Sequence, residues 1–269
     1  FLMKDAYSFD LDHDKAVKTY QSFFMCYLKT FKELGLQPIP VKAATGAIGG
    51  DLSHEFQILA KTGESELAYD PELVSQDLLE KSFDEITSMY SASDEMIDKS
   101  KSNVVIGRGI EVGHIFNFGT KYSKPLECYV LNNEGKKVTP FMGSYGIGVS
   151  RLTAAIIEAF HDDKGIKWPF NISPFKINII SSNDKFIDIA GELYDTLSKK
   201  YTNISFDDRD LSLGRKIKDS ELIGIPWSLI IGKNYDEKNE FEIINRSSGE
   251  KFFVNKQEVE NFQFEQYTP

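Results

Sequence analysis

Apolar side chains recur at every third or fourth position between Asp12 and Gly35, which predicts one long amphipathic helix. The acidic residues at its start and the glycine at its end are typical of helix boundaries. The apolar positions are Ala16, Tyr20, Phe23, Phe24, Tyr27, Leu28, Phe31 and Leu34. A helix with this pattern is expected to pack by a single face.

Alternation of polar and apolar residues predicts strands before and after this helix. In the opening segment it places Met3, Asp5 and Tyr7 on one face of a strand. Segments 36–45 and 54–60 are also strand-like, and the glycine turn GAIGG lies between them. This arrangement favours antiparallel, hairpin-like pairing over a βαβ crossover, so we expect an antiparallel sheet.

The middle of the chain carries a polar stretch followed by further strands. Residues 70–103 have helical apolar spacing and grade into a Ser/Lys-rich end, which predicts a short helical insertion at the surface. Strand character returns at 103–123 and 126–132. A glycine-rich element at 142–148 then leads directly into a helix predicted at 149–160.

The segment 167–175 holds two prolines and no periodicity, so we place a domain boundary near Ile172 and predict domains at 1–172 and 173–269. Beyond the boundary strands alternate with helices, which predicts a small α/β domain with a mixed sheet. The expected strands are 175–181, 204–208, 227–232 and 241–246, and the expected helices are 184–200, 215–223 and 256–262.

Composition narrows the class of protein. With 269 residues, 41% of them hydrophobic, the chain can build ordinary cores, and it has neither a membrane-length apolar run nor a signal peptide pattern, so the cytoplasm is the expected location. Cys26 and Cys128 give no disulfide framework. The net charge of −10 argues against a protein that coats nucleic acid without sequence preference, so any RNA contact must be local and shape-specific.

The chain opens on Phe1 within a predicted strand, so we expect it to continue upstream.

The glycine-rich element is the first candidate for chemistry. Gly143, Gly146 and Gly148 leave the backbone bare just before a helix whose first turn holds Arg151. Bare backbone admits a planar ring, and helix N-terminal amides with a guanidinium favour a phosphate, so a nucleotide triphosphate would fit. The alternative is that these glycines only permit close packing, and their position alone does not decide between the two.

Two further strands carry polar side chains in unusual settings. Glu111 and His114 lie in a strand rich in glycine, where Glu111 could hold a magnesium ion or an amine and His114 could close a polar pocket. Taken singly, His114 is more often a structural histidine and Glu111 a solvated charge at a strand edge, and it is their combination that favours a site. Asp5 beside Met3 could grip a cationic amine or be an ordinary edge-strand charge. The segment around Glu55 contains Ser, His and Glu, but no activated serine turn accompanies them, so no nucleophilic triad is predicted.

Five segments, in order along the chain, resemble the bacterial-type prolyl-tRNA synthetases: FLMKDAYSF, GAIGGDLSHEF, RGIEVGHIFNFGTKYS, MGSYGIGVSRL and DDRDLSLGRKIKDSELIGIP. GSYGIGVSRL is similar to the third class II motif and FLMKDAYSF to the strand that closes the second. The resemblance implies an α+β fold, with part of a class II antiparallel-sheet catalytic domain followed by a small α/β anticodon-binding domain with a mixed sheet. It also implies ATP, Mg²⁺, L-proline and tRNA(Pro) as reactants, a prolyl-adenylate intermediate, and a homodimer.

The resemblance also assigns roles by position. Arg151 would contact the ATP phosphates, Gly146 and Gly148 the adenine, and Glu111 a metal ion or the nucleotide. The residues that would shape the proline pocket are Met3, Asp5, His114 and Phe116. The residues that would fall in the anticodon-reading strand and helix are Asp208, Arg209, Lys216, Asp219 and Glu221.

Three departures from the family pattern qualify these expectations. Motif one and the ATP-binding arginine of motif two would lie upstream of Phe1, so the isolated chain is expected to be inactive. The insertion at 70–103 is too short for the large editing domain of many bacterial relatives, and Ser144 replaces a frequent cysteine. Two alternatives stay open: another class II synthetase of the threonyl, histidyl or glycyl type, and a non-catalytic tRNA-binding paralogue.

Overall fold

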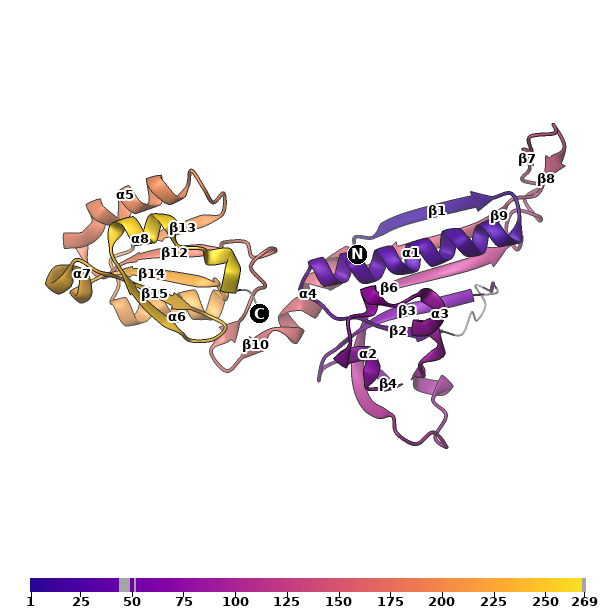
Figure 1. Cartoon of the computed structure of the whole chain (residues 1–269), viewed down its shortest axis with the longest axis horizontal. Coiled ribbons are helices and arrows are strands. Elements are labelled where there is room, and N and C mark those ends of the chain that lie inside the picture. The colour runs from indigo at the N-terminus through magenta and orange to yellow at the C-terminus, as the bar shows by residue number, and fades with distance from the viewer. Residues whose placement is uncertain (44–48, 51, 268–269) are drawn as a thin grey trace. The chain divides into compact units, whose positions relative to one another are not determined.

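The computed structural model describes residues 1–43, 49–50 and 52–267, which form two units, Phe1–Ala159 and Phe160–Pro269 (Figure 1). Each unit has its own sheet. Most of the glycine turn expected at GAIGG lies outside the described residues.

An antiparallel sheet forms the centre of the first unit, as predicted. Its main path runs β1-β9-β6-β3-β2, and β4 pairs with both β6 and β5. The strands are β1 (Lys4–Asp10), β2 (Ile39–Lys42), β3 (Leu52–Leu59), β4 (Ser65–Tyr69), β5 (Ser91–Ser93), β6 (Val105–Gly119) and β9 (Phe141–Ile147). A separate small hairpin is formed by β7 (Val130–Leu131) and β8 (Lys137–Val138).

Helix α1 (His13–Glu33) covers one face of this sheet. Its six buried residues repeat at helical spacing, because only one stripe of the helix meets the strands. Phe23 stacks on Tyr145 of β9 with ring centroids 3.7 Å apart, and Lys4 of β1 donates a hydrogen bond to Tyr27 (2.9 Å). Side chains alternate along a strand, so Asp5 and Tyr7 of β1 point to the face of the sheet that lies opposite α1. We call this side of the sheet the open face.

The insertion at 70–103 consists of several short elements. They are α2 (Glu72–Ser75), the 3₁₀ turn η1 (Leu78–Glu80), α3 (Phe83–Ser88), β5 and the 3₁₀ turn η2 (Asp94–Met96). Ser82 and Glu85 form a capping box at the start of α3, which fixes where this helix begins. Strand β5 was not expected: it pairs with β4, so this part of the insertion extends the sheet.

His54 lies on the helix-covered side of β3 and belongs to the core. Its Nδ1 is 2.6 Å from the Tyr20 hydroxyl, and the rings of Phe24 and Phe83 contact it edge-on. Burial, with a smaller contribution from the positive charge of Lys42, lowers the pKa of His54 to about 4. The imidazole is therefore neutral at pH 7.

The buried, neutral His54 makes the first unit less stable in mild acid. Its pKa is lower in the folded chain than in the unfolded chain, so the unfolded state binds more protons below pH 6.5, and stability falls as the pH drops from there toward 4. We expect His54 to cost about 1–2 kcal/mol between pH 7.5 and pH 5. Urea unfolding followed by circular dichroism should show this loss in the wild-type protein and not in His54→Gln.

Glu55 also contributes to the pH dependence of stability, but it is present in both the wild-type protein and His54→Gln, so its contribution cancels in their comparison. Burial raises the pKa of Glu55, which makes the fold more stable as the pH falls, the opposite direction. Both tryptophans, Trp168 and Trp227, lie in the second unit, so their fluorescence provides an internal control. Equal pH dependence in the two proteins would contradict a neutral His54.

The second unit contains the predicted mixed sheet, in the order β13-β12-β14-β15-β16. Strand β12 is parallel to β13 and β14, and the pairs β14–β15 and β15–β16 are antiparallel. The strands are β12 (Ile177–Ser181), β13 (Ile204–Asp207), β14 (Trp227–Ile231), β15 (Phe241–Asn245) and β16 (Lys251–Val254). Sequence patterning missed β16, which is short and exposes alternate residues.

Helices lie on both faces of this sheet (Figure 1). One face is covered by α5 (Ile187–Leu197) and α8 (Lys256–Asn261), which share an apolar core with alternate residues of the strands. The other face is covered by α6 (Leu213–Ile223), where Ser220 and Ser228 are joined by a 3.0 Å hydrogen bond. The remaining elements are η3 (Asp184–Phe186), α7 (Lys233–Lys238) and η4 (Phe264–Tyr267).

Residues 160–171 are part of the second unit by their contacts. They contain a small hairpin of β10 (His161–Asp162) and β11 (Gly165–Ile166), which packs against α6. No helix within the described part of the chain is long and apolar enough to cross a membrane.

Candidate functional site

The open face of the first sheet carries a row of side chains from four strands. Asp5 in β1 lies opposite Gly146 in β9, which lies opposite His114 in β6, which lies opposite Glu55 in β3. Directly paired residues of antiparallel strands project from the same face. The sheet thus brings together residues that are far apart in the sequence.

Two carboxylates and an imidazole form the centre of this face. His114 Nδ1 lies 3.2 Å from Glu111 Oε1 and 3.9 Å from Glu55 Oε1, and His114 Nε2 lies 2.7 Å from Ser53 Oγ. In a regular strand, residues three apart such as Glu111 and His114 would project from opposite faces. A bulge, which shifts the β3–β6 register between Phe56 and Gln57, brings Glu111 onto the face of His114.

Glu55 is a site residue that the sequence analysis did not assign. It is largely buried, which raises its pKa, and its Oε2 accepts a 2.9 Å hydrogen bond from the fully buried Gln57. The signal that could have found it is the alternation within strand 54–60, which places Ser53, Glu55 and Gln57 on one face and His54 on the other.

Arg151 lies in the first turn of α4 (Val149–Ala159), at the end of β9. Its Nη1 donates a 2.9 Å hydrogen bond to the backbone oxygen of Glu111 and lies 3.7 Å from the Glu111 carboxylate. Its side chain is 36% exposed, so the guanidinium is held at one end while its other donors can reach a ligand. This arrangement suits an anion such as phosphate.

The three glycines of this element have different surroundings. A Cβ on Gly146 would lie 3.0 Å from Met3 Cε and 3.3 Å from Asp5 Oδ1, so bare backbone forms a floor between these two side chains. A Cβ on Gly148 would lie 3.4 Å from Arg151 Cβ. Gly143 faces the helix-covered side instead, where a Cβ would lie 2.1 Å from the Tyr145 hydroxyl oxygen, so this glycine serves packing.

Phe116 adds an aromatic wall to the open face. Its ring stacks on His114 with centroids 3.9 Å apart and continues to Phe118 at 5.3 Å. Ser144 pairs with Phe116 across the sheet and therefore shares its face. All candidate residues of the first unit border this face: Met3, Asp5, Glu111, His114, Phe116, Gly146, Gly148 and Arg151.

The donor set on this face is compatible with a divalent cation. One ligand atom each from Glu55, Glu111 and His114 lie within 4.8 Å of one another. Carboxylate oxygens are the donors that Mg²⁺ prefers, and it keeps several waters when only one or two carboxylates bind it. Glu55 and Glu111 are therefore the residues that fit this ion.

The second unit gathers charged residues where β13 meets α6. Arg209 donates to both oxygens of Asp207 (2.9 and 2.7 Å) and contacts Asp219 at 3.0 Å, and Asp219 also pairs with Arg215. The guanidinium lowers the pKa of Asp207, and the two carboxylates raise the pKa of Arg209. Arg209 is about half exposed and the neighbouring Asp208 is exposed, so this network borders the surface.

Two residues of the segment that resembles the anticodon-reading strand and helix make structural contacts in the second unit. Lys216 is 2% exposed, and its Nζ donates to the backbone oxygens of Ser181 (2.9 Å) and Asp207 (3.1 Å), so it holds β12, β13 and α6 together. Glu221 pairs with Lys164 of the β10–β11 hairpin at 2.8 Å. The structure thus pairs Arg209 with Asp219 at the surface, beside the exposed Asp208. Lys216 is buried beneath the same network, and Glu221 pairs with the hairpin instead.

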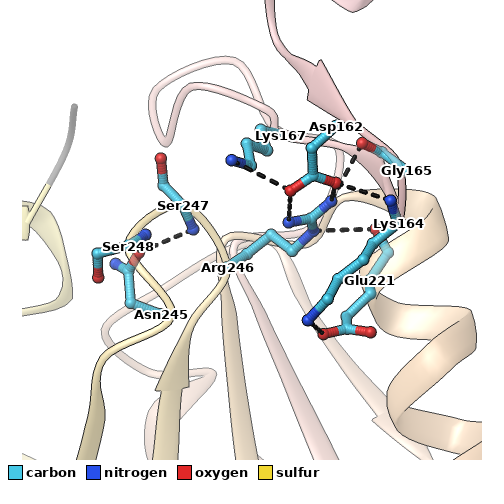
Figure 2. Close-up of polar contacts among 9 residues, drawn as sticks. All are labelled: Asp162, Lys164, Gly165, Lys167, Glu221, Asn245, Arg246, Ser247 and Ser248. Atoms are coloured by element: carbon cyan, nitrogen blue, oxygen red, sulfur yellow. Dashed lines mark hydrogen bonds and ion pairs between the residues drawn. The ribbon is translucent and has the colours of Figure 1, made fainter.

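Arg246 is a further polar centre that sequence reasoning missed (Figure 2). Its side chain is 6% exposed and makes a bidentate pair with Asp162 (2.9 and 2.6 Å). It also donates to the backbone oxygens of Gly165 and Glu221, both at 3.1 Å. These four bonds join the β10–β11 hairpin to the last turn of α6.

Two models of known protein families match this chain. Residues 1–160 match the family model described as tRNA synthetase class II core domain (G, H, P, S and T), and residues 172–264 match the anticodon binding domain model. The chain therefore belongs to the class II tRNA synthetases of this core family.

Curated relatives narrow the resemblance further. The chain is 48% identical over 255 residues to the proline–tRNA ligase of Wolbachia sp. subsp. Drosophila simulans (strain wRi), with 93% of this chain and 60% of the relative covered. It is 47% identical over 273 residues to that of Ehrlichia canis (strain Jake), with 97% and 62% covered. The chain thus spans about three fifths of the length of these relatives.

A solved structure shares the fold. The Giardia lamblia prolyl-tRNA synthetase in complex with prolyl-adenylate matches with a TM-score of 0.71 at 18% identity, covering 96% of this chain and 46% of that one. At this identity the match supports the fold alone.

Proposed function

We propose that this chain is part of a proline–tRNA ligase that activates L-proline with ATP and transfers it to tRNA(Pro). The observation that carries the proposal is the joint presence of the open-face site and relatives that are 45–48% identical and named proline–tRNA ligase. In this reaction the proline carboxylate attacks the α-phosphate of ATP and releases pyrophosphate. A terminal ribose hydroxyl of the tRNA then attacks the prolyl carbonyl of the adenylate and releases AMP.

The open face supplies positioning and charge for the first step. Arg151 lies at the edge of the glycine floor and would bind the phosphates, while Gly146 and Gly148 leave room for the adenine. Mg²⁺, when bound by Glu111 and Glu55, would neutralise phosphate charge. Phosphoryl transfer of this kind depends mostly on such positioning and electrostatics, and the attacking group in the first step is the carboxylate of proline itself.

The proline pocket would lie between Asp5 and the His114–Phe116 stack. Asp5 would hold the ammonium-like nitrogen of proline, Met3 and Phe116 would contact its ring, and the imidazole of His114 is fixed by Ser53. A small ring against apolar and aromatic walls with one carboxylate is compatible with L-proline.

We further propose that the second unit contacts the anticodon of tRNA(Pro) with the exposed edge of the Asp208–Arg209–Asp219 network. The proposal also includes a domain boundary near Ile172, which rests on the two prolines of segment 167–175, and a cytoplasmic location, which rests on composition. The family resemblance adds a homodimer.

Amino-acid-dependent ATP–pyrophosphate exchange by the complete protein that contains this chain tests the function, screened across the standard amino acids. Exchange with proline alone is expected. Exchange with threonine, histidine or glycine would indicate a different class II synthetase, and absence of exchange with retained tRNA binding would indicate a non-catalytic paralogue.

The role of the second unit can be tested with Arg209→Ala. Because Arg209 ties Asp207 to Asp219, its loss should disorganise the exposed edge and weaken binding of tRNA(Pro) by about tenfold or more in a filter-binding titration. Lys199→Ala removes one positive charge from the end of α5 and is the matched control. An equal decrease in the two variants would mean that only net charge matters, and the anticodon role would be wrong.

A further inference from the structure

A second cavity lies in the first unit, on the face of β3 opposite to the candidate active site. Its volume is about 460 Å³, within the range of small-molecule sites. It is bounded by β2, β3, α3 and the chain that follows α3. Its apolar walls include Leu52, Phe83, Ile86, Met89 and Met96.

His54 provides a hydrogen-bond donor to this cavity. The Tyr20 hydroxyl has no other described acceptor, so it donates to His54 Nδ1, and the neutral imidazole then carries its proton on Nε2. The described residues provide no acceptor for this N–H. His54 is only 6% exposed, and it lines the cavity. An N–H that borders a cavity without a protein partner can donate a hydrogen bond to a ligand bound there.

Two lysines add positive charge at the same place. Lys42 and Lys101 both line the cavity and are exposed. Neither ammonium forms an ion pair with a carboxylate of the described residues. Asp98, whose pKa is lowered by hydrogen bonds from Ser100 and also by the charge of Lys101, is the acidic group on which Lys101 acts. Lys101 also lies 5.5 Å from the centre of the Tyr90 ring, which keeps it beside the cavity.

From these groups we propose that the cavity binds a small organic anion, a carboxylate carried on an apolar body. The carboxylate would accept the His54 N–H bond and pair with Lys42 and Lys101, and the body would pack against the methionine and aromatic walls. Because the cavity and the candidate active site lie on opposite faces of β3, this site is independent of the proposed function.

Methionine methyl groups give a direct test, since the chain has five methionines and two of them line the cavity. The chain labelled with ¹³C-methyl methionine would be titrated with 3-phenylpropionate and with its neutral amide, 3-phenylpropionamide. We expect saturable shifts at Met89 and Met96 with the acid, binding at least tenfold tighter than the amide, and unchanged signals from Met3 and Met142 on the other face.

Lysine variants separate the anion site from general attraction. Lys42→Gln should weaken binding of the acid by about tenfold and leave that of the amide unchanged, whereas Lys99→Gln, an exposed lysine outside the cavity, should leave both unchanged. Equal affinity for acid and amide, equal effects of the two variants, or shifts confined to Met3 and Met142 would each overturn the proposal. Acetate binding as tightly as 3-phenylpropionate would show that the apolar walls contribute nothing, and would overturn it too.

Discussion

Arg151→Ala is expected to lower proline-dependent ATP–pyrophosphate exchange by the complete protein at least 10³-fold, an order-of-magnitude estimate for removing a preorganised charge from a phosphate site. The guanidinium is anchored by the backbone oxygen of Glu111, and the Arg151 side chain is 36% exposed, so its remaining donors can reach a ligand. Alanine removes both the charge and the directed donors. Steady-state exchange rates over a range of ATP and proline concentrations measure the loss.

Arg151→Lys is the matched variant, because it keeps the positive charge and loses the planar fork of donors. It should retain more exchange than Arg151→Ala while still falling well below the wild-type rate. Thermal unfolding of both variants should stay close to wild type, since the side chain is 36% exposed and its pair with Glu111 is partly solvated. Exchange within tenfold of wild type for Arg151→Ala would remove the phosphate role.

Arg246→Met should destabilise the second unit by about 2–4 kcal/mol, somewhat less than the roughly 3–5 kcal/mol for removing one partner of a fully buried ion pair, because the Asp162 side chain is 33% exposed. The substitution leaves the Asp162 carboxylate without its bidentate partner and leaves two backbone oxygens without a donor (Figure 2). Urea unfolding followed by tryptophan fluorescence measures this directly, because Trp168 and Trp227 both lie in the second unit.

Lys164→Met provides the control from the same cluster. Lys164 pairs with Glu221 but its side chain is 64% exposed, so its loss should cost less than about 1 kcal/mol. Similar destabilisation by the two variants would mean that the buried Arg246 pair contributes no more than a surface pair. The β10–β11 hairpin would then not depend on Arg246 for its attachment to α6.

The local pattern of apolar and polar residues predicts most of the helices and strands of the two units. The spacing from Ala16 to Phe31 predicts α1 and its buried stripe, and alternation in β1 separates the face of Asp5 from the face of Lys4. Both follow from the fixed periods of helices and strands, which depend only on neighbouring residues. The same holds for the alternation of strands and helices that predicts the mixed sheet of the second unit.

Local pattern also explains which elements were missed. The missed elements include β4, with five residues, β5 with three, β16 with four and the two-residue strands β10 and β11, which are too short for alternation to distinguish them from loops. Strands β5 and β16 are each stabilised by pairing with a longer strand, β4 and β15 respectively. Their existence depends on that partner, which lies outside the local sequence.

The sequence by itself therefore determined most of the longer elements, the α+β class and the motif residues of the open face, because these depend on local periodicity and residue type. Only the tertiary structure decided that Glu55 joins Glu111 and His114, because that depends on a bulge and on strand register. It likewise decided that Lys216 is buried and that Arg246 meets Asp162 across 84 positions of sequence. Such contacts arise from packing between distant segments, and no short pattern encodes them.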